Sequence, residues 1–191
     1  MATQQMVGAT AQWRLVVTDA LGNNPKNLSD WWIIDPNFSP DNQSIVFIAF
    51  PSNNLSFDVT QLELHRADYD ANSNSISNIV RLTNNNTRDH DPSYSPDGSQ
   101  IVFSAGNANY TNVDIVVYDV ATKIETIVVN DSAANGGSMD WSNDGSSIYF
   151  HSLDLTAHPF RIKQVDVLSQ NVTTVLETQN NGFGFYHPEV Y

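Results

Sequence analysis

Short apolar runs of four to six residues recur along the whole chain, and each run is closed by Asn, Asp, Gly, Pro or Ser. The runs are rich in Val, Ile, Tyr, Phe and Thr, as in residues 113–119 (VDIVVYD). Several alternate apolar and polar positions, which is the period of a strand, whereas apolar residues at helical spacing are nearly absent. The pattern predicts an all-β protein of short antiparallel strands.

One turn motif lies between two such runs and is repeated. Residues 91–103 read DPSYSPDGSQIVF, residues 35–47 read DPNFSPDNQSIVF, and residues 139–150 read MDWSNDGSSIYF. Proline at the second turn position presets φ, aspartate can bond its own backbone, and glycine accepts a positive φ. The sequence therefore predicts the same tight hairpin three times.

The spacing of two landmarks indicates the architecture. The turn serines Ser39, Ser95 and Ser142 are 56 and 47 residues apart. An aspartate also ends the third strand candidate of each unit, with steps of 49, 51 and 47 residues between Asp19, Asp68, Asp119 and Asp166. Repeats of this length with four short strands are typical of propeller blades, whose sheets must pack face to face to cover both apolar faces.

Four blade units follow within a single propeller domain over residues 1–191. They span residues 33–84, 89–130 and 138–177, and a further unit that joins residues 1–29 to residues 186–191. The N-terminal unit lacks an innermost strand, and residues 187–191 (HPEVY) supply one. We therefore expect the two termini to complete one blade, which leaves no open sheet edge there. The alternatives are a closed ring of four blades, eight blades from a homodimer, or a piece of a longer propeller.

Composition and charge limit the classes of partner that the chain is expected to bind. The chain has 8 Lys+Arg against 21 Asp+Glu, and its formal net charge of −13 would repel phosphate backbones and anionic lipids. Nucleic acid is therefore not an expected partner. Cysteine is absent, which excludes disulfides, thiolate zinc sites and cysteine nucleophiles. The N-terminus has no basic leader, and no run of 18 apolar residues predicts a membrane span.

The stretch DPSYSPDGSQIVFSA followed by DIVVYDV resembles the repeat of the TolB translocation protein and of related prolyl-oligopeptidase-type propellers. The resemblance covers essentially the whole chain and implies a periplasmic or extracellular protein, but it says little about chemistry. The chain departs from the pattern in having four units where six or more are usual. It also has Asn42 in place of the usual glycine and Asn143 in place of proline.

In such a propeller the start of each innermost strand lines a central channel, where ligands usually bind. The polar candidates are Asp35, Asn37, His90, Asp91, Asp140, His187 and Glu189. No cofactor is expected; the alternative is a divalent cation in the acidic channel, or a transition metal if His90 faces His187. We favour a structural role over a metal site. In that role, an aspartate before proline stabilises a turn or accepts backbone N–H groups between blades.

Aromatic residues near the same face are the other candidates. Trp31, Trp32 and Tyr186 precede innermost strands, where exposed rings could anchor a peptide or stack on a sugar, or simply pack between blades. Phe38, Tyr94 and Trp141 recur at one repeat position, and we expect them to pack between blades.

Catalytic sequence motifs are missing, including the nucleophile elbow, phosphate-binding glycine loop and zinc-protease helix. The sequence therefore favours a noncatalytic module that holds a protein or peptide segment at the channel face. The alternative is a metal-assisted enzyme or a carbohydrate-binding propeller that uses the channel His and Asp residues and the aromatic loops.

Overall fold

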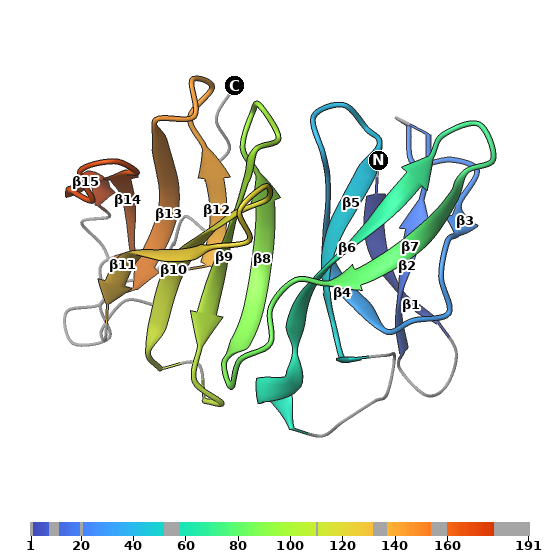
Figure 1. The fold of residues 1–191 in the computed structure, drawn as a ribbon, viewed down its shortest axis with the longest axis horizontal. Helices are drawn as coiled ribbons and strands as arrows, with labels where there is room; N and C mark the ends of the chain where they lie inside the picture. The colour runs from blue at the N-terminus through green and yellow to red at the C-terminus, as the bar shows by residue number, and fades with distance from the viewer. Residues whose placement is uncertain are drawn as a thin grey trace. The chain divides into compact units, whose positions relative to one another are not determined.

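The structure is a computed structural model that describes residues 2–7, 12–19, 21–51, 58–109, 111–131, 137–153 and 160–177. Within these ranges every regular element is a strand, apart from one short 3-10 turn, η2 (Val59–Gln61) (Figure 1). The strands form four antiparallel sheets. The predicted all-β fold is therefore confirmed.

The first compact unit, residues 1–92, contains two sheets. One has the order β1 (Ala2–Val7), β2 (Gln12–Val17), β3 (Lys26–Asn27). The other has the order β4 (Ile33–Phe38), β5 (Ser44–Ala49), β6 (Glu63–Asp70), β7 (Ser75–Arg81). Leu15 of the first sheet packs with Ile33 and Phe47 of the second, and all three are fully buried. The innermost strand predicted at residues 187–191, and with it the joining of the termini, lies outside the described residues.

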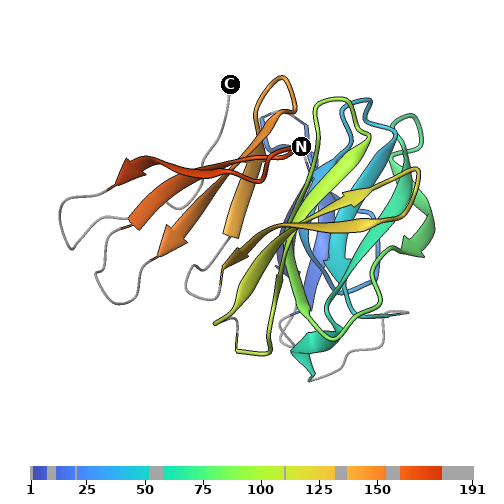
Figure 2. The ribbon, with the colours of Figure 1, turned by 60° about the vertical axis from the view of Figure 1, so that its left-hand side comes forward.

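The second compact unit, residues 93–191, also has two packed sheets. One has the order β11 (Glu125–Asp131), β10 (Val113–Asp119), β9 (Gln100–Gly106), β8 (Arg88–Tyr94), so β8 begins in the first unit. Figure 2 shows the strands of the other side by side in orange and red: β12 (Gly137–Trp141), β13 (Ser147–Leu153), β14 (Phe160–Asp166), β15 (Val172–Glu177). Ile115 and Val117 pack with Ile148 and Phe150 in a common core, as expected for adjacent blades.

The repeated turn owes its shape to its serine and aspartate. Ser95 Oγ donates to Asp97 Oδ1 at 2.7 Å and accepts the backbone N–H of Gln100 at 2.9 Å. Asp97 Oδ1 also accepts the N–H of Ser99 at 3.0 Å. The turns at Ser39 and Ser142 have the same bonds. Each hairpin therefore satisfies its own polar groups locally.

A left-handed residue recurs at a single position of the innermost strands. Asp35, Asp91 and Ser138 have φ values of 52°, 50° and 46°. Pairing shifts register beside two of them, between Ile34 and Asn37 on β4 and between Gly137 and Asp140 on β12. These are bulges, which bend a strand and re-aim its side chains.

The turn between the third and fourth strands of a blade is closed by an aspartate. Asp119 Oδ1 accepts the N–H of Thr122 at 2.7 Å, and Asp166 Oδ1 accepts the N–H of Ser169 at 2.7 Å. In the blade formed by β4 to β7, Asp70 closes this turn instead, because β6 runs two residues beyond Asp68. Asp68 instead pairs with Arg66 at 3.0 Å.

Candidate functional site

The side chains of the first residues of β8 take part in two separate groups of polar residues in the first unit. Successive residues of a strand point to opposite faces. His90, with Arg88, therefore lies on one face, where it meets Asp35 of β4. Asp89 lies on the other, where it meets the loop after β7 and the start of β6. One strand end thus joins both groups.

The first group is a chain of three side chains. Arg88 Nε donates to His90 Nε2 at 2.7 Å, and His90 Nδ1 lies 3.0 Å from Asp35 Oδ2. Because Nε2 accepts the guanidinium N–H, the imidazole proton is on Nδ1 and is donated to the carboxylate. Asp35 Oδ2 also accepts the backbone N–H of Asp91 at 3.3 Å, which is the bond expected of an aspartate before proline. The side chains of His90 and Asp35 are 17% and 20% exposed.

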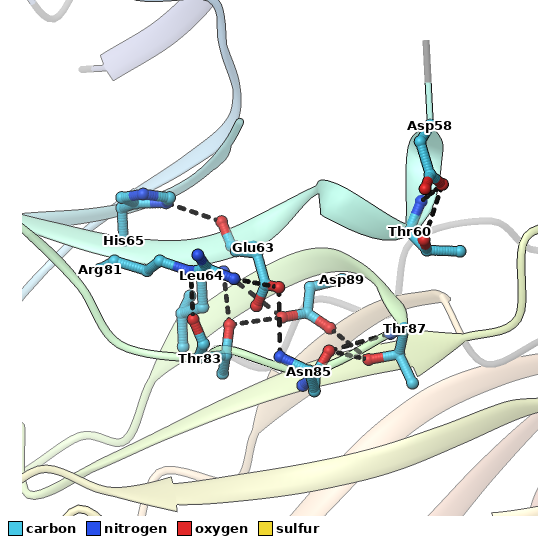
Figure 3. Close-up of polar contacts among 10 residues, drawn as sticks. All are labelled: Asp58, Thr60, Glu63, Leu64, His65, Arg81, Thr83, Asn85, Thr87 and Asp89. Atoms are coloured by element: carbon cyan, nitrogen blue, oxygen red, sulfur yellow. Dashed lines mark hydrogen bonds and ion pairs between the residues drawn. The ribbon is translucent and has the colours of Figure 1, made fainter. Parts of the chain in front are cut away.

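The second group is centred on the buried carboxylate of Glu63 at the start of β6 (Figure 3). Its Oε1 accepts from Arg81 at 2.6 Å and from the backbone N–H of Asn85 at 3.2 Å. Within the described residues, Glu63 Oε2 is buried without a hydrogen-bond partner. The guanidinium at the end of β7 compensates the buried charge.

Asp89 is the second buried carboxyl of this network (Figure 3). Its Oδ2 accepts from the Thr83 hydroxyl at 2.7 Å and faces the N–H of Leu64 at 3.4 Å, and its Oδ1 accepts from Thr87 at 3.0 Å. Burial, with a smaller contribution from the charge of Glu63, raises the pKa of Asp89 to about 7. Asp89 is therefore a carboxyl that titrates near neutral pH.

His65, two residues after Glu63, supports the same strand end. Its ring stacks on Phe47 at 5.8 Å and meets Trp31 edge-on at 5.7 Å, and its Nδ1 bonds the carbonyl of Glu63 at 2.9 Å. Burial lowers the pKa of His65 to about 4. The imidazole is therefore neutral at physiological pH and is part of the core.

The network fixes the loop between β7 and β8. The hydroxyls of Thr83 and Thr87 donate to Asp89, and the backbone N–H of Asn85 donates to Glu63. Asn85 Oδ1 in turn accepts the N–H of Thr87 at 3.0 Å. The alternate residues, Asn84 and Asn86, are exposed. An Asn amide carries both a donor and an acceptor. The loop therefore presents two amides on a rigid support beside the strand that carries His90.

The structure brings together three of the predicted site residues, Asp35, His90 and Asp91. Asn37 lies two residues beyond Asp35 on the same strand, opposite Val46 of β5. Asp140 is in the second unit, where its Oδ1 accepts the N–H of Trp141 at 2.9 Å. The remaining polar and aromatic predictions at the C-terminus, Tyr186, His187 and Glu189, lie outside the described residues.

The predicted aromatic residues of the first unit are partly buried. Trp31 packs against the core of Leu15 and Phe47, and Trp32 stacks on Phe50 at 5.1 Å. At the recurring repeat position, Trp141 is 3% exposed and lies in the core of the second unit, in agreement with its expected packing role.

Glu63, Arg81 and Asp89 were not singled out by the sequence analysis. Glu63 occupies a polar position of the alternation in QLELH, and Asp89 belongs to the polar run RDHD, so neither pattern marked a buried carboxyl. Across the described ranges no group of three or more His, Asp or Glu is placed to hold a metal ion. No helix in those ranges is long and apolar enough to span a membrane.

Comparison with known proteins identifies the family. The sequence model of the TolB beta propeller domain, PD40, matches residues 2–181. The chain belongs to this TolB beta propeller family. The resemblance seen in the repeated turn is therefore confirmed.

Solved structures similar to this TolB-type chain include a protein assigned as TolB from Agrobacterium tumefaciens (TM-score 0.71, 20% identity) and TolB from Acinetobacter baumannii (0.68, 22%). An oligogalacturonate lyase in complex with manganese is also similar (0.63, 14%). The alignments cover 92%, 91% and 86% of this chain but 60%, 40% and 48% of those proteins. The chain thus spans less than two thirds of the length of each, and the likeness is one of fold.

Proposed function

We propose that the chain is a noncatalytic binding module that holds a protein or peptide segment at the face formed by the β7–β8 loop and the start of β8. The observation that carries the proposal is the pairing of exposed amides with a rigid support. Asn84 and Asn86 are exposed, while Asn85 between them donates its backbone N–H to Glu63, and Thr83 before them donates its hydroxyl to Asp89. Groups that are already ordered lose little entropy when a ligand binds.

The amides and the His90 group suit a peptide backbone. An extended segment offers alternating N–H and C=O groups, and each Asn amide can donate to one and accept from the other. The partly exposed carboxylate of Asp35 adds an acceptor for a cationic or hydroxyl side chain. The similarity to two TolB structures supports a binding role by analogy of fold.

Selection from a random peptide library on the immobilised protein tests this proposal. We expect enriched peptides to lose about tenfold or more in affinity for the Asn84→Ala/Asn86→Ala variant and for His90→Ala, because each removes hydrogen-bonding groups. Asn171→Ala is the matched control, since Asn171 is also exposed but lies directly before the outermost strand β15 of the second unit. Failure to enrich any peptide, or equal loss in the control, counts against the binding face.

A second candidate is a metal-assisted or carbohydrate-directed activity. It is favoured by one observation, the imidazole of His90 held between a guanidinium and a carboxylate, and by the fold shared with an oligogalacturonate lyase that binds manganese. Thermal shift with manganese, together with a lyase assay on oligogalacturonate, separates the two candidates. A His90-dependent shift and product formation would favour the enzyme over the binding module.

A further inference from the structure

A groove crosses the second unit between its two sheets, at the end where the hairpin turns lie. One hollow of about 590 Å³ is lined by Asp119, Ile124, Val128, Asp166, Val167 and Leu168, among others. A second, of about 280 Å³, is lined by Pro96, Asp97 and Asp144. Both include Gln100 and Gly145, so the two hollows are adjacent, and together they form the groove. This groove is built from other residues than the proposed binding face of the first unit.

The groove carries negative charge. Its carboxylates are Asp97, Asp119, Asp144 and Asp166. Hydrogen bonds from their own turns lower the pKa of all four, that of Asp144 to about 2, so they are ionised at neutral pH. No Lys or Arg is among the described residues that line either hollow. The fixed charge in the groove is therefore of one sign.

The same groove has apolar walls. Leu168 is 95% exposed at the tip of the β14–β15 turn, and Ile124 is 60% exposed before β11. Gln170 Nε2 donates to the carbonyl of Ile127 at 3.3 Å, which ties this turn to the outer strand of the neighbouring sheet. Isolated exposed apolar residues are common, but here they flank a concave surface with four carboxylates.

We propose that this groove binds an extended segment of a partner protein that alternates basic and apolar side chains. Lys or Arg side chains would meet the four carboxylates, and Leu, Ile or Val side chains would cover Ile124 and Leu168. Charge complementarity selects this occupant, because an acidic or uncharged segment would leave the carboxylates without counter-charges. Phosphate-bearing partners such as nucleic acid are repelled by the same charges.

The test uses fluorescein-labelled dodecapeptides and fluorescence anisotropy. The probe alternates Arg and Leu, and the two matched peptides alternate Arg with Ser or Glu with Leu. We expect the Arg–Leu peptide to bind most tightly, with an affinity that falls as NaCl is raised because the attraction is screened. Equal binding of either matched peptide, or no binding of the Arg–Leu peptide, overturns the proposal.

Two variants locate the binding. Leu168→Ser removes apolar contact area and should weaken binding about fivefold, and Asp166→Asn removes one charge and should weaken it about threefold to tenfold. Asn at position 166 can still accept the N–H of Ser169, so the turn is retained. Asp70→Asn is the control because Asp70 closes the corresponding turn of the first unit, where it accepts the N–H of Asn72.

We expect the control to bind within about twofold of wild type. Binding that is unaffected by both groove variants, or weakened equally by Asp70→Asn, contradicts the assignment to the groove. The Asn84→Ala/Asn86→Ala variant should bind the Arg–Leu peptide normally. The proposal for the groove and the proposal for the binding face can therefore be tested independently.

Discussion

Trp141 on β12 donates its indole N–H to the backbone carbonyl of Ser93 on β8 at 3.1 Å, in the buried core of the second unit. Trp141→Phe keeps an aromatic ring but leaves that carbonyl without its donor and leaves a small cavity. We expect a loss of about 1–3 kcal/mol in the free energy of unfolding, measured by urea denaturation. Trp32→Phe, at a partly exposed ring, is the comparison and should lose less, and an unchanged stability of Trp141→Phe would show that the Ser93 bond contributes nothing.

Asp89 makes stability fall as pH rises. Its folded pKa of about 7 lies above the unfolded value of about 3.9. Between these two pKa values the unfolded state ionises while the folded state keeps its proton, so the free energy of unfolding falls as pH rises. The contribution of Asp89 is complete below about pH 4 and is lost progressively as pH approaches 7, with a total on the order of 4 kcal/mol. Asp89→Asn should abolish this part of the pH dependence in denaturation curves recorded between pH 4 and 8. An unchanged slope would mean that Asp89 is ionised in the folded state throughout this range.

His65 acts in the opposite direction. Its folded pKa of about 4 lies below the unfolded value of about 6.5, so its contribution is complete above about pH 6.5 and is lost as pH falls toward 4, on the order of 3 kcal/mol. In the wild type the two groups partly cancel. His65→Phe, which preserves an aromatic ring beside Phe47, should leave the falling slope of Asp89, whereas Asp89→Asn should leave the rising slope of His65. Identical slopes in the two variants would contradict this assignment.

The ion pair between Glu63 and Arg81 compensates a fully buried carboxylate. Arg81→Met removes the partner and leaves the charge, and we expect a loss of about 3–5 kcal/mol in the free energy of unfolding. The double variant Glu63→Gln/Arg81→Met should recover much of that loss because no unpaired charge remains. Chemical denaturation of both variants tests the idea, and failure of the double variant to recover would assign the loss to the missing bond from Arg81 Nε to the carbonyl of Thr83.

The stability of the turn at Ser142 should rise if it receives the proline that the two equivalent turns have. Asn143 occupies the position of Pro40 and Pro96, and Gly145 donates its N–H to the Ser142 carbonyl at 2.9 Å, as Gly98 does to Ser95. Asn143→Pro should raise stability by about 0.4–1 kcal/mol by restricting the unfolded chain. Pro96→Asn is the reverse control and should lower it by a similar amount. Thermal denaturation of both variants provides the measurement, and destabilisation by Asn143→Pro would show that the third turn differs from the other two.

Those features that depend on neighbouring residues could be predicted from the sequence. The serine and aspartate of each turn act on atoms within five positions, so the hairpin and its repetition were evident from spacing. The repeat frame placed both His90 and Asp35 at the start of innermost strands, but their direct contact was not predicted. The repeat frame thus located part of the candidate site.

The buried network could not be predicted in the same way. Glu63 and Arg81 are 18 residues apart, and Leu64 and Asp89 are 25 apart. Their meeting depends on the register of β6 with β7 and on the course of the following loop, which alternation alone does not specify. The departure of Asp70 from the expected turn position has the same origin, since β6 continues beyond Asp68.

Each serine and aspartate turn satisfies its own polar groups, so the hairpin of one blade needs no hydrogen bond from a neighbouring blade to hold its shape. Gene duplication or loss of a whole unit would therefore create no orphaned donor or acceptor at the turn, and only the apolar faces would have to find new neighbours. Sequence drift would then be tolerated most readily in the connecting loops, so that new recognition surfaces can evolve on a conserved frame.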